Sequence, residues 1–321
     1  MYRLSILFLL LVTPFLACAD QGQLADLPEE GEVSAEAITG RWDVTVETES
    51  DGYPSWFEIT QENGRLAGQF VGRVGSARPI EQISFENGTL TFSLEPQYED
   101  YDTDMSFSGE FVDNQLKGTT NAPDGGTLSW TAVRAPELAP PDNVQWGEPI
   151  QLFNDQNLEG WKLRDPDAAQ TWEAQNGVLV NTASGTDLIT EDEFESFRLQ
   201  MDFRYPEGSN SGVYLRGRYE LQIQDDIGKE PGSLFIGGVY GFLTPTVNAA
   251  RPAGEWQNYD ITLLGRQITV ILNGQTVIDN QEIPGITGGA LDPHEAEAGP
   301  IMLQGDHGPV SFRNIVLTPA Q

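Results

Sequence analysis

The stretch "NSGVYLRGRYELQIQD", residues 210–225, decides the fold of the C-terminal half, because it alternates apolar and polar residues on both sides of a short turn. Such alternation predicts two β-strands, and the central Gly217 is typical of a hairpin turn. A two-residue loop would mix apolar and charged side chains on one face. A three-residue loop, 216–218, pairs Leu215 with Tyr219 and Tyr214 with Glu220, and we expect this register because it sorts the two faces.

The sorted register predicts one apolar and one polar face. The core face carries Val213, Leu215, Tyr219, Leu221 and Ile223. The opposite face carries Tyr214, Glu220 and Gln222, with Arg216 at its edge. A solvated outer face and the floor of a binding site are both compatible with this pattern.

Period-two alternation recurs along most of the chain and predicts an all-β protein. In residues 37–136, turn signals at Asn63-Gly64, Asn87-Gly88 and Asp113-Asn114 predict a small antiparallel domain, a lipocalin-like barrel or sandwich whose tryptophans lie in its core. The proline-rich stretch 137–148 predicts a linker. Residues 149–321 predict a β-sandwich, with a hairpin at Asn273-Gly274 and a helical turn allowed only within 188–197.

The N-terminus predicts export. An apolar run over residues 4–16 is short for a membrane span and resembles a signal peptide of residues 1–17. Cys18, the only cysteine, follows Ala17 as in a bacterial lipobox, so we expect it to be lipidated; the alternative is an ordinary signal peptide that contains a cysteine. Residues 19–36 predict an acidic tether. The protein is therefore expected to be lipid-anchored in the cell envelope, at the periplasm, the outer membrane or the cell surface.

Charge and composition exclude several functions. Seventeen Lys and Arg oppose 49 Asp and Glu, which leaves a formal net charge of −32. Nucleic acid and anionic lipid are poor partners for such a surface, so membrane contact is expected through the lipid anchor only. Two histidines and one cysteine make a structural zinc site implausible. The chain also lacks the nucleophile-elbow, P-loop and dinucleotide-binding motifs.

Polar residues on other predicted strands favour a binding site over a solvated face. Gln304 and His307 lie in "IMLQGDHG", and Tyr240 lies in "IGGVYGF". A polar sheet bordered by aromatic rings is typical of sandwich proteins that bind sugars. Retaining glucanases on such sandwiches use alternating acids on one strand, but Glu220 is followed here by amides at 222 and 224, which disfavours a two-carboxylate displacement. Arg313 is expected to form an ion pair at the sheet edge.

Residues 150–318 resemble the 3-keto-disaccharide hydrolase family, a family with a concanavalin-like jelly-roll fold. The resemblance is carried, in order, by "LFNDQNLEGW" (152–161), "TWEAQNGVLV" (171–180), "NSGVYLR" (210–216), "YELQIQD" (219–225), "PAGEWQNYDITLLGRQITVILNGQTV" (252–277) and "GPIMLQGDHGPVSFRNI" (299–315). It implies cleavage of the glycosidic bond of a sugar whose 3-hydroxyl is oxidised to a ketone. Members carry a longer excursion where this chain has only Gly217 and Arg218, so the resemblance does not supply that wall of the site.

A substrate of this kind suggests a mechanism that needs only one base. The 3-ketone acidifies the C2 proton, the C1 substituent leaves by elimination, and water then adds. On this hypothesis Glu220 is the base and His307 the acid, and Gln222 and Arg216 bind hydroxyls or stabilise the enolate. The side chains that position the sugar are Tyr214, Asn210, Gln304 and Tyr240. A divalent metal ion held by Glu220 is an alternative electrophile, and no other cofactor is expected.

Each of these residues also has a structural interpretation. Glu220 and Arg216 would form a surface ion pair, His307 would be a turn residue, and Asn210 would begin a strand. Two other functions fit the same features: a lipid-anchored carbohydrate-binding protein without catalysis, and a structural or adhesion lipoprotein. An acid and a histidine in one pocket favour the enzyme.

Overall fold

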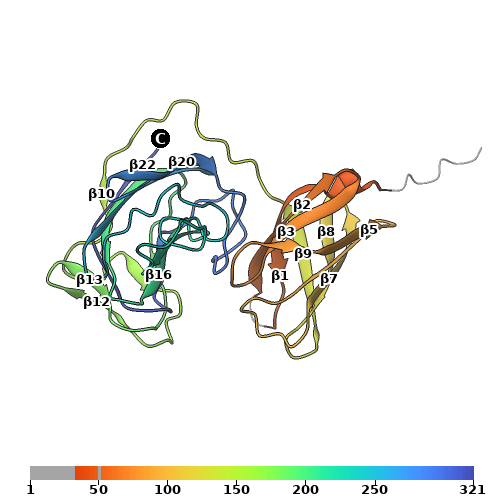
Figure 1. Cartoon of the computed structure of the whole chain (residues 1–321), viewed down its shortest axis with the longest axis horizontal. Helices are drawn as coiled ribbons and strands as arrows, with labels where there is room; N and C mark the ends of the chain where they lie inside the picture. Colours follow the sequence, from red (N-terminus) through yellow and green to blue (C-terminus); the bar gives the residue numbers. More distant parts are fainter. Residues whose placement is uncertain (1–32, 50–51) are drawn as a thin grey trace, which may run out of the picture. The chain divides into compact units, whose positions relative to one another are not determined.

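Twenty-two β-strands and one short 3₁₀ helix make up residues 33–49 and 52–321, the part of the chain that the computed structural model describes (Figure 1). The all-β prediction is confirmed. The helical turn allowed within 188–197 is wrong, because β14 (Leu188–Thr190) pairs with strands on both sides there. The predicted signal peptide, Cys18 and the tether up to residue 32 lie outside the described residues. Within 33–49 and 52–321, no helix is long and apolar enough to cross a membrane.

The N-terminal half forms one antiparallel sheet in which the first and last strands pair. The order is β4-β3-β2-β1-β9-β8-β7-β6-β5. Contacts of β3 with β5 and of β4 with β6 bring its two ends together, as in a barrel. The 3₁₀ helix η1 (Ala35–Ile38) precedes it. The strands are β1 (Gly40–Val46), β2 (Tyr53–Glu62), β3 (Arg65–Val71), β4 (Arg78–Ile80), β5 (Gln82–Glu86), β6 (Thr89–Leu94), β7 (Met105–Val112), β8 (Gln115–Asn121) and β9 (Thr127–Arg134).

The C-terminal half contains two antiparallel sheets. The larger has the order β12-β13-β22-β15-β18-β19-β20, with β10 also paired to β22, and the smaller has the order β11-β14-β21-β16-β17. The larger sheet consists of β10 (Ile150–Gln151), β12 (Trp172–Gln175), β13 (Val178–Asn181), β15 (Phe197–Arg204), β18 (Gln257–Leu264), β19 (Gln267–Leu272), β20 (Gln275–Glu282) and β22 (Val310–Pro319). The smaller consists of β11 (Trp161–Leu163), β14, β16 (Asn210–Leu215), β17 (Tyr219–Gln224) and β21 (Met302–Leu303).

Turn chemistry explains much of the strand pairing. Asn273 and Gly274 have φ angles of 52° and 81° between β19 and β20, and Asn63 and Gly64 have 51° and 77° between β2 and β3. Positive φ at both central residues is the requirement of the tight turns that match the twist of a hairpin, and Asn-Gly meets it at little cost. The turn predictions at both positions are confirmed.

The core of the C-terminal half lies between its two sheets. Val213, Leu215, Leu221 and Ile223 from the smaller sheet are fully buried in the same apolar cluster as Phe203 and other alternate residues of β15 in the larger sheet. This arrangement confirms the predicted core face of residues 210–225. In the N-terminal sheet, Trp42 and Trp130 are buried with several phenylalanines, which confirms that these tryptophans are core residues. Trp56 is also fully buried, but in the apolar cluster of the C-terminal half.

Candidate active site

A cavity of about 480 Å³ lies over the other face of the β16–β17 hairpin. Its size is within the range of roughly 300–1,000 Å³ that is usual for small-molecule sites. It brings together all of the predicted site residues except Arg216. The lining consists of Val74, Gly75, Tyr98, Arg164, Asp187, Asn210, Tyr214, Glu220, Gln222, Tyr240, Gly288, Gly289, Gln304, Asp306 and His307.

The hairpin register places the central side chains of this cavity. Tyr214 is paired with Glu220, and Gly212 with Gln222. The side chains of Tyr214, Glu220 and Gln222 therefore lie on the cavity face, where Gly212 has no side chain, as the three-residue loop predicts. A β-carbon at position 212 would lie 2.5 Å from Oε1 of Glu220, well inside van der Waals contact. Gly212 therefore leaves the space that the Glu220 carboxyl group occupies.

Glu220 is a buried acid with a raised pKa. Only 4% of its surface is exposed, which excludes the surface ion pair with Arg216. Burial raises the pKa of its carboxyl group to about 8, while the hydrogen bond from Tyr214 and the charge of His307 oppose that shift. The Tyr214 hydroxyl lies 3.0 Å from Oε2 of Glu220 and 2.9 Å from the carbonyl oxygen of Gly288. A carboxyl group with this pKa changes its protonation state close to neutral pH.

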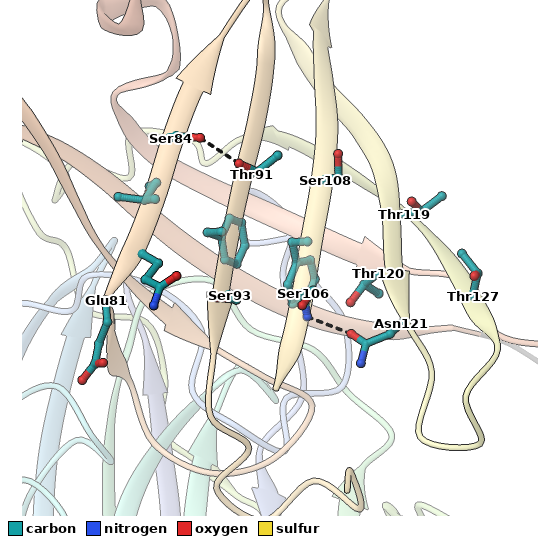
Figure 2. Close-up of a pocket in the computed structure, with 14 residues that line it drawn as sticks. Glu81, Ser84, Thr91, Ser93, Ser106, Ser108, Thr119, Thr120, Asn121 and Thr127 are labelled. Carbon is teal, nitrogen blue, oxygen red and sulfur yellow. Dashed lines mark hydrogen bonds between the residues drawn. The ribbon is translucent and has the colours of Figure 1, made fainter. Parts of the chain in front are cut away.

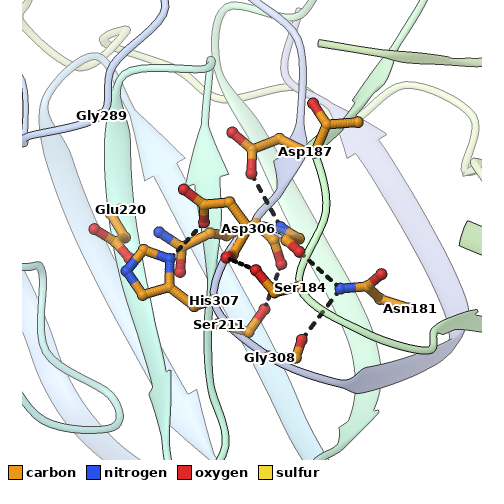
Figure 3. Close-up of polar contacts among 12 residues, drawn as sticks. Asn181, Ser184, Asp187, Ser211, Glu220, Gly289, Asp306, His307 and Gly308 are labelled. Carbon is orange, nitrogen blue, oxygen red and sulfur yellow. Dashed lines mark hydrogen bonds and ion pairs between the residues drawn. The ribbon is translucent and has the colours of Figure 1, made fainter. Parts of the chain in front are cut away.

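His307 faces Glu220 from the loop after β21. Figure 3 shows the imidazole and the Glu220 carboxyl group pointing toward one another, and Nδ1 of His307 is hydrogen-bonded to Oδ1 of Asp306. This hydrogen bond and the charges of Asp306, Glu220 and Asp187 raise the pKa of His307, against the effect of its partial burial. The structure therefore provides a partly exposed imidazole, held by one carboxylate and directed at a second.

Arg164 and Asp187 also line the cavity, and no sequence pattern predicted either of them. Arg164 donates to Oδ2 of Asp187 at 3.0 Å and to the carbonyl oxygen of Gly289 at 3.0 Å. Oδ1 of Asp187 accepts from the amide of Gly305 at 3.0 Å. Both residues come from loops of the smaller sheet, where no alternation marks them. Arg164, and not Arg216, is the arginine that lines the cavity.

The predicted sugar-binding residues differ in whether their side-chain polar atoms already have hydrogen-bond partners. The side-chain oxygens of Asn210 and Gln304 are buried and have no hydrogen-bond partner among the described residues, so both can accept from a ligand. The Gln222 side chain instead bonds to backbone groups of Leu234 and Ile223. Tyr240 is held beside β17 by its backbone amide, which donates to the carbonyl oxygen of Glu220 at 3.0 Å.

Arg216 does not reach the cavity, so the prediction that it binds substrate is corrected. Its φ of 55° turns it out of the strand alternation on which that prediction depended. The guanidinium group is buried and donates to the carbonyl oxygens of Glu295 and Glu297. Arg216 therefore holds the turn against a neighbouring loop. Arg313 forms the predicted ion pair, with Asp202 at 3.1 Å.

The cavity does not have the side chains of a protein-held metal site. Within residues 33–49 and 52–321, no three His, Cys, Asp or Glu side chains are grouped as metal ligands. The carboxylates nearest Glu220 in the cavity already have partners: Asp187 binds Arg164 and Gly305, and Asp306 binds His307. These residues do not fit the divalent ion considered from the sequence.

A second cavity of about 730 Å³ lies over strands β5 to β9 (Figure 2). Hydroxyl groups dominate its lining, and some bond to one another, as Ser84 does to Thr91 at 2.8 Å. Glu81 is its only titratable residue, and no acid–base pair is present. This cavity therefore has no counterpart of the Glu220 and His307 pair in the first cavity.

Comparison with known proteins identifies the C-terminal half. Residues 148–318 match the family model of the 3-keto-alpha-glucoside-1,2-lyase-like domain, which confirms the expected resemblance. No curated protein matches the chain significantly.

Three similar solved structures come from Parabacteroides distasonis, each assigned provisionally as a glycosyl hydrolase. The first is 26% identical, has a TM-score of 0.45, and covers 57% of this chain and 93% of its own. The second is 21% identical, has a TM-score of 0.43, and covers 53% of this chain and 93% of its own. The third is 29% identical, has a TM-score of 0.42, and covers 53% and 98%. Each therefore matches part of this chain along nearly its own whole length.

Proposed function

This chain belongs to the 3-keto-alpha-glucoside-1,2-lyase-like family, and from this premise we propose that it cleaves the glycosidic bond of 3-keto-disaccharides or related 3-keto-glycosides. The observation that carries the proposal is the pairing of one buried acid, Glu220, with one imidazole, His307, in a cavity of small-molecule size. Because a ketone at C3 acidifies the C2 proton, one base and one acid are sufficient to cleave the bond by elimination.

The reaction proceeds by elimination and then addition of water. A base removes the proton from C2, and the electron pair is delocalised into the C3 carbonyl group as an enolate. The enolate re-forms the carbonyl as the C1–O bond breaks, which leaves a C1–C2 double bond, and the departing oxygen takes a proton from an acid. Water then adds at C1 and a proton returns to C2, so the net reaction is hydrolysis.

Glu220 is the base in this scheme and His307 is the acid. Burial favours the neutral form of Glu220 and therefore makes its carboxylate a stronger base than an exposed glutamate. Asp306 raises the pKa of His307 and so keeps a proton available for the leaving oxygen. The carboxylate of Glu220 and the cation of His307 coexist best midway between the pKa values of the two groups.

Arg164 is suited to stabilise the enolate, since its guanidinium group lines the cavity. Tyr214 donates its hydroxyl proton to Glu220 and so positions the base. The free side-chain oxygens of Asn210 and Gln304 are suited to accept from sugar hydroxyls. No second carboxylate is required as a nucleophile, which agrees with the amides that follow Glu220 in β17.

The test is incubation of the full chain with 3-keto-trehalose, 3-keto-sucrose and their unoxidised parents, with and without chelator, followed by product analysis. We expect cleavage of the keto sugars only. Glu220→Gln should abolish it. Asp225→Asn is the matched control, because Asp225 has the opposite parity and accepts from the amide of Gly208 at 2.8 Å. Failure to cleave any keto sugar would contradict the proposal and favour binding without catalysis.

A further inference from the structure

Two loops of the N-terminal sheet line the same cavity as Glu220 and His307. Val74 and Gly75 come from the loop between β3 and β4, and Tyr98 comes from the loop between β6 and β7. The family match begins at residue 148 and does not include them. These residues add a wall to the site that the matched domain alone lacks.

Close backbone contacts hold this wall in place. The amide of Gly289 donates to the carbonyl oxygen of Arg73 at 2.9 Å. A β-carbon at position 288 would lie 2.2 Å from the carbonyl oxygen of Gly75, so only glycine at 288 allows these two backbone segments to come so close. Nearby, the rings of Trp56 and Phe242 pack edge to face, 5.3 Å apart.

The core also joins the two halves at this point. Trp56 and Val71, from the N-terminal sheet, are fully buried in the apolar cluster of the C-terminal sandwich. Residues 33–321 accordingly cluster as one compact unit. The wall is therefore a packed part of the molecule.

Tyr98 lies at the outer side of the cavity. The loop that carries it is tied to the Val74 loop, because Oε1 of Gln97 accepts from the amide of Ser76 at 2.8 Å. Tyr98 itself nevertheless remains 67% exposed. Burial, the charge of Glu220 and the Tyr98 hydroxyl raise the pKa of Tyr240 to about 12. Tyr240, Glu220 and Tyr98 line the same cavity, and Tyr98 adds an aromatic ring from the N-terminal sheet.

We propose that Tyr98 and the Val74–Gly75 loop form a subsite for the leaving group, in which the Tyr98 ring stacks on the second sugar of a disaccharide. The proposal rests on the proposed function, which places the oxidised sugar over Glu220. An aromatic ring presents an apolar face to the C–H face of a sugar ring, and such contacts are favourable when the ring is held in position. The N-terminal sheet then favours substrates that have a second ring.

The test compares 3-keto-trehalose with methyl 3-keto-α-glucoside, which lacks the second ring. Tyr98→Ala should lower the kcat/KM ratio of the disaccharide to the methyl glycoside about tenfold, the effect of losing one aromatic contact. Tyr98→Phe, which keeps the ring, should restore it. Val112→Ala is the control, because Val112 is also exposed (51%) on the same sheet and lines neither cavity.

The outcomes separate this proposal from the proposed function. Wild-type turnover with an unchanged substrate ratio in Tyr98→Ala would overturn the subsite and leave the function intact. If wild type cleaves neither sugar, the function fails, and titration calorimetry with 3-keto-trehalose decides the subsite. Binding that weakens about tenfold in Tyr98→Ala would uphold it. Equal binding to both proteins, or binding to neither, would overturn it.

Discussion

Replacing Glu220 with glutamine should stabilise the protein at alkaline pH while abolishing its activity. Burial raises the pKa of the carboxyl group from 4.5 to about 8 in the folded chain. Between these values the unfolded chain has released its proton and the folded chain has not. The free energy of unfolding therefore falls as the pH rises from 4.5 to about 8. Above that range, the protein has the whole loss of stability that ionisation of the buried Glu220 causes.

The expected size follows from the same two values. One pKa unit corresponds to about 1.4 kcal/mol, so the raised pKa of Glu220 costs the wild-type protein up to about 5 kcal/mol at a pH of about 9. Glutamine has nearly the shape of a protonated glutamate and never ionises. Glu220→Gln should therefore have about the wild-type stability near pH 4 and exceed it increasingly above pH 5.

Urea unfolding of both proteins at several pH values between about 4 and 9 measures this difference. Other titrating groups, such as Asp43 with its own raised pKa, are common to both proteins, so their contributions largely cancel in the difference. A stability difference that does not change with pH would refute the reasoning. It would mean that Tyr214 and His307 stabilise the carboxylate as much as burial penalises it.

Three further predictions follow from the described contacts. The kcat/KM for a 3-keto-disaccharide should have a bell-shaped pH profile with one limb near about 8, since Glu220 must be ionised and His307 protonated; a Glu220→Gln variant that kept both limbs would contradict the assignment. Gly212→Ala should lower kcat at least about tenfold by displacing the carboxyl group, as steady-state kinetics would show. Arg266→Met should lower the free energy of unfolding by about 3–5 kcal/mol in urea, because Glu295 is fully buried against it at 2.5 Å. The control is the pair of Arg198 and Asp260, whose arginine side chain is 45% exposed, and its loss should cost under about 1 kcal/mol.

The sequence predicts those parts of the site that follow from strand alternation. Once the loop 216–218 is known to contain three residues, parity alone brings Tyr214, Glu220 and Gln222 to one face, and the structure has that register. Asn-Gly pairs likewise predict the hairpin turns, because only a few residues tolerate positive φ. The fold and the floor of the cavity are therefore readable from local rules.

Loop residues of the site follow no such rule. Arg164, Asp187 and Tyr98 reach the cavity from loops whose positions depend on tertiary packing, and their sequence neighbourhoods resemble any polar loop. For Arg216 the sequence-based prediction is wrong in the other direction. Strand parity places its side chain at the polar edge, but its left-handed backbone conformation directs the side chain away from the cavity. Alternation holds within a strand and ends where the strand ends.

Burial of Glu220 connects the instability of the site to its proposed chemistry. The C2 proton next to a ketone is a weak acid, and an exposed glutamate, with a pKa near 4.5, is a poor base for it. Removing water from the carboxyl group raises its pKa and so strengthens it as a base, while the same desolvation lowers the stability of the fold above pH 4.5. Tyr214 limits the shift with one hydrogen bond and does not cancel it. A change that admits water to Glu220 should therefore make the protein more stable at alkaline pH and make Glu220 a weaker base.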